Sequence, residues 1–129
     1  MIQNFKCAIA VITAGIWVNV SEFFRNEYLL KTFWVSYYES HGMTFPSEPI
    51  NGVIWLVWGF LFASAVYIVS RRFNLLQTAL IGWLMGFVLM WLVAINLNAM
   101  PIYILAYAVP LSLLETSICT VICIKISPR

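Results

Sequence analysis

Apolar residues along this chain gather into four long runs separated by shorter polar segments. The runs cover residues 7–24, 51–70, 75–97 and 102–124. Each approaches the ~20 residues that a helix needs to cross a hydrocarbon core about 30 Å thick. None shows the strict alternation of apolar and polar positions that is typical of a membrane β-strand. The pattern therefore predicts an all-α integral membrane protein, a bundle of four transmembrane helices in a single domain.

The connection between the first two spans, residues 26–50, is long and has a helical pattern of its own. Within residues 26–38, NEYLLKTFWVSYY, apolar side chains recur at helical spacing. We expect a helix that either continues the first span or lies flat on the membrane surface. A surface helix is favoured, and a lid over a cavity between the helices is the alternative. Gly42, Pro46 and Pro49 should end this helix and turn the chain into the second span.

Composition narrows the class of protein further. Hydrophobic residues make up 63% of the 129 residues and charged residues only 9%, against roughly 45–50% and about 25% in soluble domains. So few charges cannot cover a water-facing surface, and so apolar a chain is not intrinsically disordered. The formal net charge of +2 is too small and too scattered to indicate binding to nucleic acid.

Lysine and arginine residues predict the direction in which the spans cross. Membrane proteins keep a surplus of these residues in short cytoplasmic segments. Five of the seven flank the same ends of the predicted spans: Lys6, Arg71, Arg72, Lys125 and Arg129. Acidic residues outnumber basic ones around the long first connection on the other side. We expect a plasma-membrane or inner-membrane protein with both termini cytoplasmic, an uncleaved first span and residues 26–50 outside.

Motifs for catalysis, metal binding or cofactor binding are missing from the sequence. It has no glycine-rich phosphate loop, no H-E-x-x-H and no G-x-S-x-G. His41 is the only histidine, so a typical zinc site is not expected. Cys7, Cys119 and Cys123 form no C-x-x-C pair and are interpreted as small packing residues. The sequence therefore favours a protein that is not an enzyme, and it leaves the cofactor unassigned.

Gly82 and Gly86 lie four residues apart in the third predicted span. Small residues at this spacing let two helix backbones approach closely. We expect them to pack within the bundle, and a homodimer contact is the alternative.

Glu115 is the deepest ionisable residue of the predicted spans. It precedes Lys125 by ten residues, about 15 Å along a helix, which places it near mid-membrane. A lone charge there costs at least ~2.5–3.5 kcal/mol, so we expect Glu115 to face the bundle interior and to be protonated, paired or hydrated. By height along the helices, Asn19 is its nearest polar neighbour in the first span. Glu22 lies above both and should pair with Arg25, three residues further on.

Polar and aromatic side chains gather in the outer halves of the spans. This asymmetry predicts an outward-opening pocket that binds its ligand through Asn19, Glu22, Trp58, Trp91, Asn96, Tyr107 and Glu115. The alternative interpretation is structural. In that case the polar groups hydrogen-bond to one another and set the helix register, and the aromatic rings form an ordinary interface belt.

Three functions fit this pattern. The favoured one is binding of a small amphipathic or lipid-like molecule, or docking onto a larger membrane partner, within the lipid bilayer. The alternative is a proton-coupled carrier in which Glu115 exchanges a proton for substrate; at this size it would need to form a homodimer. An enzyme that uses Glu22 and Glu115 as acid and base is least supported, because no nucleophile, metal set or cofactor motif accompanies them.

Overall fold

A computed structural model describes all 129 residues of the chain, and helices are its only regular secondary structure. Four helical stretches are long and apolar enough to cross a membrane: Ile2–Leu29, Pro49–Ser70, Leu75–Asn96 and Ile102–Ile126. The prediction of an all-α, four-helix membrane bundle is therefore confirmed.

The first and third of these stretches are each built from more than one helical segment. The first comprises α1 (Ile2–Phe23) and a π-helical segment, η1 (Phe24–Leu29). The third comprises α4 (Leu75–Trp83), the π-helical segment η2 (Leu84–Val88) and α5 (Leu89–Asn96). Segments of π-helix are rare and occur frequently at functional sites, so their places in the fold are informative.

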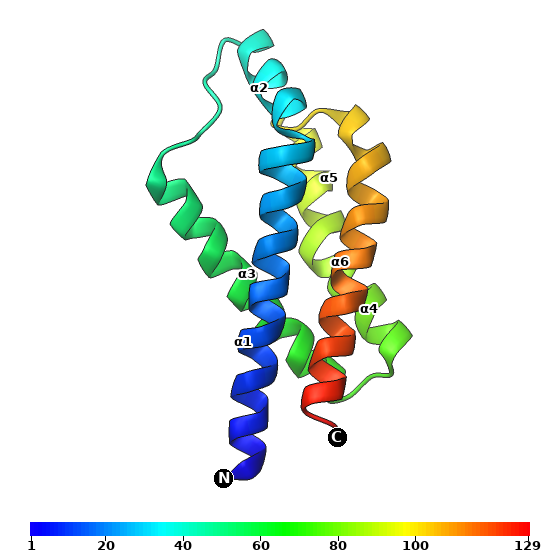
Figure 1. The fold of residues 1–129 in the computed structure, drawn as a ribbon. Helices are drawn as coiled ribbons and strands as arrows, with labels where there is room; N and C mark the ends of the chain where they lie inside the picture. Colours follow the sequence, from blue (N-terminus) through cyan, green and yellow to red (C-terminus); the bar gives the residue numbers. More distant parts are fainter.

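The remaining helices complete the bundle. These are α2 (Lys31–Ser40), α3 (Pro49–Ser70), the short 3₁₀ turn η3 (Ile102–Ile104) and α6 (Leu105–Ile126). The helix α1 packs against α3 and α6, and α4 packs against the same two helices on the other side. Both ends of the chain lie at one end of the bundle, here called the terminal end, and α2 lies at the opposite loop end (Figure 1).

Two capping boxes show why α3 and α4 begin where they do. The side chains of Glu48 and Asn51 bond reciprocally to each other's backbone N–H at the start of α3, where Pro49 occupies the first turn. Asn74 and Gln77 form the same arrangement at the start of α4. Each box satisfies two N–H groups that a helix terminus otherwise leaves without partners.

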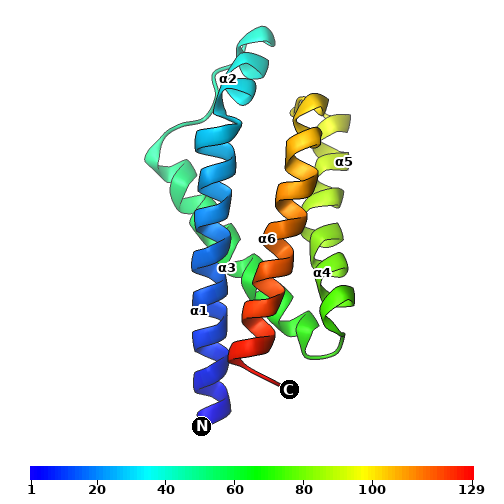
Figure 2. The ribbon, with the colours of Figure 1, turned by 45° about the vertical axis from the view of Figure 1, so that its right-hand side comes forward.

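The helix α3 crosses the bundle obliquely, so that its first turns lean away from α5 and α6 (Figure 2). Apolar side chains in these turns are accordingly open, with Ile50, Val53 and Ile54 each more than half exposed. Because α3 is apolar along its whole length, these exposed side chains are suited to contact lipid.

The connection between the first two spans contains α2, which continues beyond α1 at the loop end (Figures 1 and 2). The chain bends at Leu30, whose N–H bonds to the Arg25 carbonyl at 2.8 Å. The Tyr37 hydroxyl then donates to the Asn98 carbonyl at 2.8 Å, which ties α2 to the link between α5 and α6. The helix α2 thus follows the first span at the loop end as a separate helix beyond this bend. It ends before Gly42, which adopts a φ of +70°.

The glycine pair of the third span serves packing within the chain. A Cβ added to Gly86 would lie 2.3 Å from a ring carbon of Phe62 in α3. One added to Gly82 would lie 3.2 Å from methyl groups of Val66 and Thr116. These glycines let α4 and η2 approach their neighbours closely. They therefore take the expected role in packing within the bundle.

Candidate functional site

Three ionisable side chains from two membrane spans meet in the interior of the bundle. Glu22 of α1 is 6% exposed, Arg25 of η1 is 5% exposed, and Glu115 of α6 is 0% exposed. Arg25 Nη2 lies 2.5 Å from Glu22 Oε1, and Arg25 Nη1 lies 3.8 Å from Glu115 Oε1. We call these three residues the buried ionic cluster. It confirms the predicted pairing of Glu22 with Arg25 and the interior position of Glu115.

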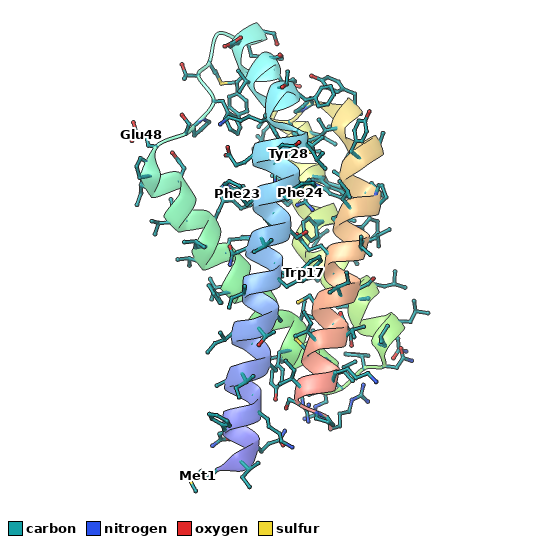
Figure 3. The ribbon with its side chains drawn as sticks, in the orientation of Figure 1. Met1, Trp17, Phe23, Phe24, Tyr28 and Glu48 are labelled. Atoms are coloured by element: carbon teal, nitrogen blue, oxygen red, sulfur yellow. The ribbon has the colours of Figure 1, made fainter.

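Side-chain direction explains why Arg25 reaches Glu115. Side chains on a helix slant towards its N-terminus. Since α1 and α6 run in opposite directions (Figure 1), the Arg25 side chain slants towards the terminal end and the Glu115 side chain towards the loop end. They converge although their backbones are at different heights. Trp17, which is level with the Glu115 backbone, donates its indole N–H to the Glu115 carbonyl at 3.0 Å and points from α1 towards α6 (Figure 3).

Asn19 does not take the place next to Glu115 that its height along the helix predicted. Its amide donates to the carbonyls of Gly15 at 2.9 Å and of Leu56 in α3 at 3.4 Å. Its side chain lies against Gly59, where an added Cβ would approach it to 2.6 Å. Asn19 therefore bridges α1 and α3, because the helix rotation directs it to α3 rather than to α6.

Hydrogen bonds satisfy one side of the buried ionic cluster and leave the other open. Asn26 donates its amide to Glu22 Oε2 at 3.0 Å and accepts from the Trp34 indole at 3.2 Å. Both carboxylate oxygens of Glu22 therefore have donors. In contrast, Arg25 Nη1 and both carboxylate oxygens of Glu115 are buried without a hydrogen-bond partner. The 3.8 Å separation between Arg25 and Glu115 is an ion-pair contact that is too long for a hydrogen bond.

One π-helical segment contributes a residue to the buried ionic cluster, and the other packs against that residue. Arg25 belongs to η1, and Phe87 belongs to η2. The guanidinium carbon of Arg25 lies 5.2 Å from the centre of the Phe87 ring, a cation–π contact between the two segments. The two irregular helix turns of the membrane spans thus meet at the one buried cation, which is consistent with the frequent occurrence of π-bulges at functional sites.

Four further residues were predicted to bind the ligand. Trp58 and Trp91 lie beside Phe87, whereas Asn96 and Tyr107 lie apart from it. Trp58 and Trp91 pack on Phe87 with ring centres 5.7 and 5.9 Å away. Tyr107 is 53% exposed and stacks 6.0 Å from Phe33 of α2. Asn96 is the exposed last residue of α5. The fold therefore brings Glu22 and Glu115 to Arg25 and packs Trp58 and Trp91 against Phe87, the ring that Arg25 contacts. It leaves Asn96 and Tyr107 on the surface.

Two hollows in the loop end lie beside the connection between the first two spans. One of about 240 Å³ is lined by Lys31, Val35, Glu39, Thr44, Phe45 and Ser47. Another of about 300 Å³ is lined by Thr44, Phe45, Pro46, Ser47, Glu48 and Asn51. The start of α3 at Glu48 marks this region in Figure 3. Neither hollow includes a residue of the buried ionic cluster, which is closed in this conformation.

The important residue that the sequence interpretation underestimated is Arg25. The first apolar run ends at residue 24, so the sequence alone gives Arg25 a place outside the bundle. The spacing of Glu22, Arg25 and Asn26 on one helical stripe was the available signal. Phe87 carried no signal of its own, since one phenylalanine in an apolar span is indistinguishable from the others.

The fold and the cluster define a class: a four-helix membrane bundle with an ionic cluster enclosed between its first and last spans. Comparison with family models, with curated proteins and with solved structures finds no match to this chain.

Proposed function

We propose that this membrane protein binds a small amphipathic or lipid-like molecule in the loop half of the bundle, with the polar group of the ligand at Glu115. Three buried atoms without hydrogen-bond partners support this proposal: Glu115 Oε1, Glu115 Oε2 and Arg25 Nη1. A buried polar atom without a partner costs about 1–3 kcal/mol, and more if it is charged. A ligand that supplies the missing partners would recover that free energy.

The unpaired atoms indicate the chemistry of the ligand. Glu115 requires a hydrogen-bond donor and Arg25 requires an acceptor. A hydroxyl group or an amide offers both, and an apolar body would suit the rings of Trp58, Phe87 and Trp91, which pack together beside the cluster. The cluster is closed, so binding requires α1 and α6 to separate at the loop end. Docking onto a larger membrane partner remains the second form of this proposal.

Mass spectrometry of the purified protein tests this proposal. We expect a co-purifying amphipathic molecule in the wild type, and at a similar level in Glu115→Gln, whose amide keeps a donor and an acceptor. Glu115→Leu should lose it, because leucine offers no hydrogen bond. Glu27→Gln is the matched control, since Glu27 is exposed and pairs only with Lys31. A wild type without any bound molecule, or a Leu variant that retains it, would contradict the proposal.

A proton-coupled carrier is the second candidate, and one specific feature of the cluster favours it. Two carboxylates contact a single guanidinium, so the cluster carries one net negative charge when both are ionised. Binding one proton makes it neutral, and a neutral cluster is far less costly to bury in a membrane. Glu115 is the carboxyl with a free place for this proton, because neither of its oxygens has a hydrogen-bond partner, whereas Glu22 receives two hydrogen bonds.

Proton movement across the membrane of reconstituted vesicles tests the carrier. An enclosed pH-sensitive dye should report proton exit from wild-type vesicles when a candidate substrate is added outside, because the carrier exchanges one for the other. In Glu115→Gln the dye response should disappear while ligand binding persists. Equal responses from the two proteins would eliminate Glu115 as the coupling residue.

We further propose that the terminal end is cytoplasmic and that α2 faces outwards, in a plasma or inner membrane. The clustering of basic residues at the terminal end supports this orientation. Reporter fusions after residue 129 should be active only with a cytoplasmic reporter, and fusions within 40–48 only with an external one. The reverse pattern would overturn the orientation and would turn the loop half towards the cytoplasm.

A further inference from the structure

We infer that the terminal end of the bundle binds the phosphate groups of anionic phospholipids. Five cations lie there: Lys6, Arg71, Arg72, Lys125 and Arg129. None of them forms an ion pair, because the three ion pairs of the chain involve only Arg25 and Lys31 as cations. This inference is independent of the buried ionic cluster, and it assigns a ligand to a different part of the molecule.

The fold gathers these cations around one buried residue, Ser127. The Ser127 hydroxyl bonds to Gln3 of α1 at 3.2 Å and to the Tyr67 hydroxyl of α3 at 3.1 Å. Ser127 itself is 0% exposed at the end of α6. Lys6 lies less than one helix turn beyond Gln3, and Lys125 lies two residues before Ser127. Segments from α1, α3 and α6 are therefore fixed side by side, and with them their positive charges.

Two of the arginines hold this arrangement together without losing their charge. Arg71 donates to the carbonyls of Ser127 at 2.5 Å and Pro128 at 3.1 Å. In return Arg129 donates to the carbonyls of Ser70, at 3.0 Å, and Phe73. Carbonyl groups satisfy the N–H donors but supply no counter-charge. Lys6, Arg72 and Lys125 are exposed at the surface of the same structure, where they are available to an external anion.

Exposed apolar residues next to the cations indicate a lipid rather than a free anion. Phe5, next to Lys6, is 66% exposed, and Phe73, next to Arg72, is 41% exposed. A phospholipid has its phosphate beside its acyl chains, so it can contact the cation and the apolar ring together. The site also lies where the four spans end, which is the depth of the headgroups. Juxtamembrane clusters of four to eight basic residues are typical binding sites for anionic lipids.

Native mass spectrometry of the full chain in detergent, titrated with phosphatidylglycerol or with phosphatidylcholine of the same acyl chains, tests the inference. We expect saturable binding of phosphatidylglycerol and much weaker binding of phosphatidylcholine. Each basic residue near a membrane surface contributes about fivefold to such binding. Arg72→Gln should thus weaken phosphatidylglycerol binding about fivefold, and Lys6→Gln/Arg72→Gln/Lys125→Gln on the order of 100-fold. Lys31→Gln, at the loop end, is the matched control and should bind like the wild type.

Three results would overturn the inference. The first is equal affinity for the two lipids, and the second is an equal loss of binding in Lys31→Gln and Arg72→Gln. The third is displacement of phosphatidylglycerol by millimolar inorganic phosphate, which would identify a free-phosphate site. Because Arg72 is exposed, Arg72→Gln should fold. This single variant therefore tests the inference even if the triple variant fails to fold.

Discussion

Arg25→Gln will lower the free energy of unfolding by about 3–5 kcal/mol, the usual cost of removing one partner from a buried ion pair. Arg25 is the only cation that contacts Glu22 and Glu115, and all three side chains are at least 93% buried. Its removal leaves two carboxylates enclosed between α1 and α6 without a counter-charge. Unfolding of the purified protein in mixed micelles with increasing denaturing detergent measures the change.

Two further variants separate charge from packing in this experiment. Glu22→Gln/Arg25→Gln/Glu115→Gln removes all three charges and should recover most of the stability, because replacement of a whole buried ionic group is often neutral or favourable. Lys31→Gln breaks an exposed pair with Glu27 and should change the free energy by less than about 1 kcal/mol. A triple variant as unstable as Arg25→Gln would show that the size of the Arg25 side chain, not its charge, matters at this position.

Gly86→Ala will destabilise the bundle by about 1–3 kcal/mol, because the added methyl group has no space. It would lie 2.3 Å from a ring carbon of Phe62. That ring is itself held between Trp58 at 5.1 Å and Phe87 at 5.4 Å, so it cannot move aside freely. Displacement of the Phe62 ring would press on Phe87, and Phe87 is the residue that packs against Arg25. The same denaturation assay measures the loss.

Gly52→Ala is the matched control for this substitution and should have the opposite sign. Nothing lies within 4 Å of a Cβ added to Gly52, which is in the first turns of α3. Alanine in an open helical position stabilises by roughly 0.5–1 kcal/mol relative to glycine. In addition, Phe62→Leu should relieve part of the Gly86→Ala strain, so the double variant should cost less than the two single costs combined. Equal losses in Gly86→Ala and Gly52→Ala would contradict the packing explanation.

The buried ionic cluster is enclosed, so a ligand could reach it only if helices separate at one end of the bundle. Packing holds α1, α3, α4 and α6 together towards the terminal end, where Ser127 joins three helices. Towards the loop end, α3 leans away (Figure 2), and Tyr37 links α2 to the α5–α6 connection by a single hydrogen bond. An opening that exposes Arg25 would have to break this hydrogen bond and the contacts of the Phe33 ring with Tyr103 and Tyr107.

The sequence by itself determined the architecture, because the thickness of a bilayer sets the length of an apolar helix. Three of the four predicted runs agree with the observed helices to within a few residues. It also determined that Glu115 faces the interior and that Glu22 pairs with Arg25. The first conclusion rests on the cost of a carboxyl group in hydrocarbon, and the second on spacing along one helix. Neither depends on how the helices are arranged relative to one another.

Only the tertiary structure decided which residues meet. Heights counted along straight helices placed Glu115 beside Asn19, but helix rotation turned Asn19 towards Gly59 of α3. The opposite slants of side chains on antiparallel helices brought Arg25 and Glu115 together instead. The first helix also continues through Leu29, beyond the end of its apolar run. A buried cation is tolerable there because Glu22, Glu115 and the Phe87 ring surround it, and these contacts come from three segments that are distant in the sequence.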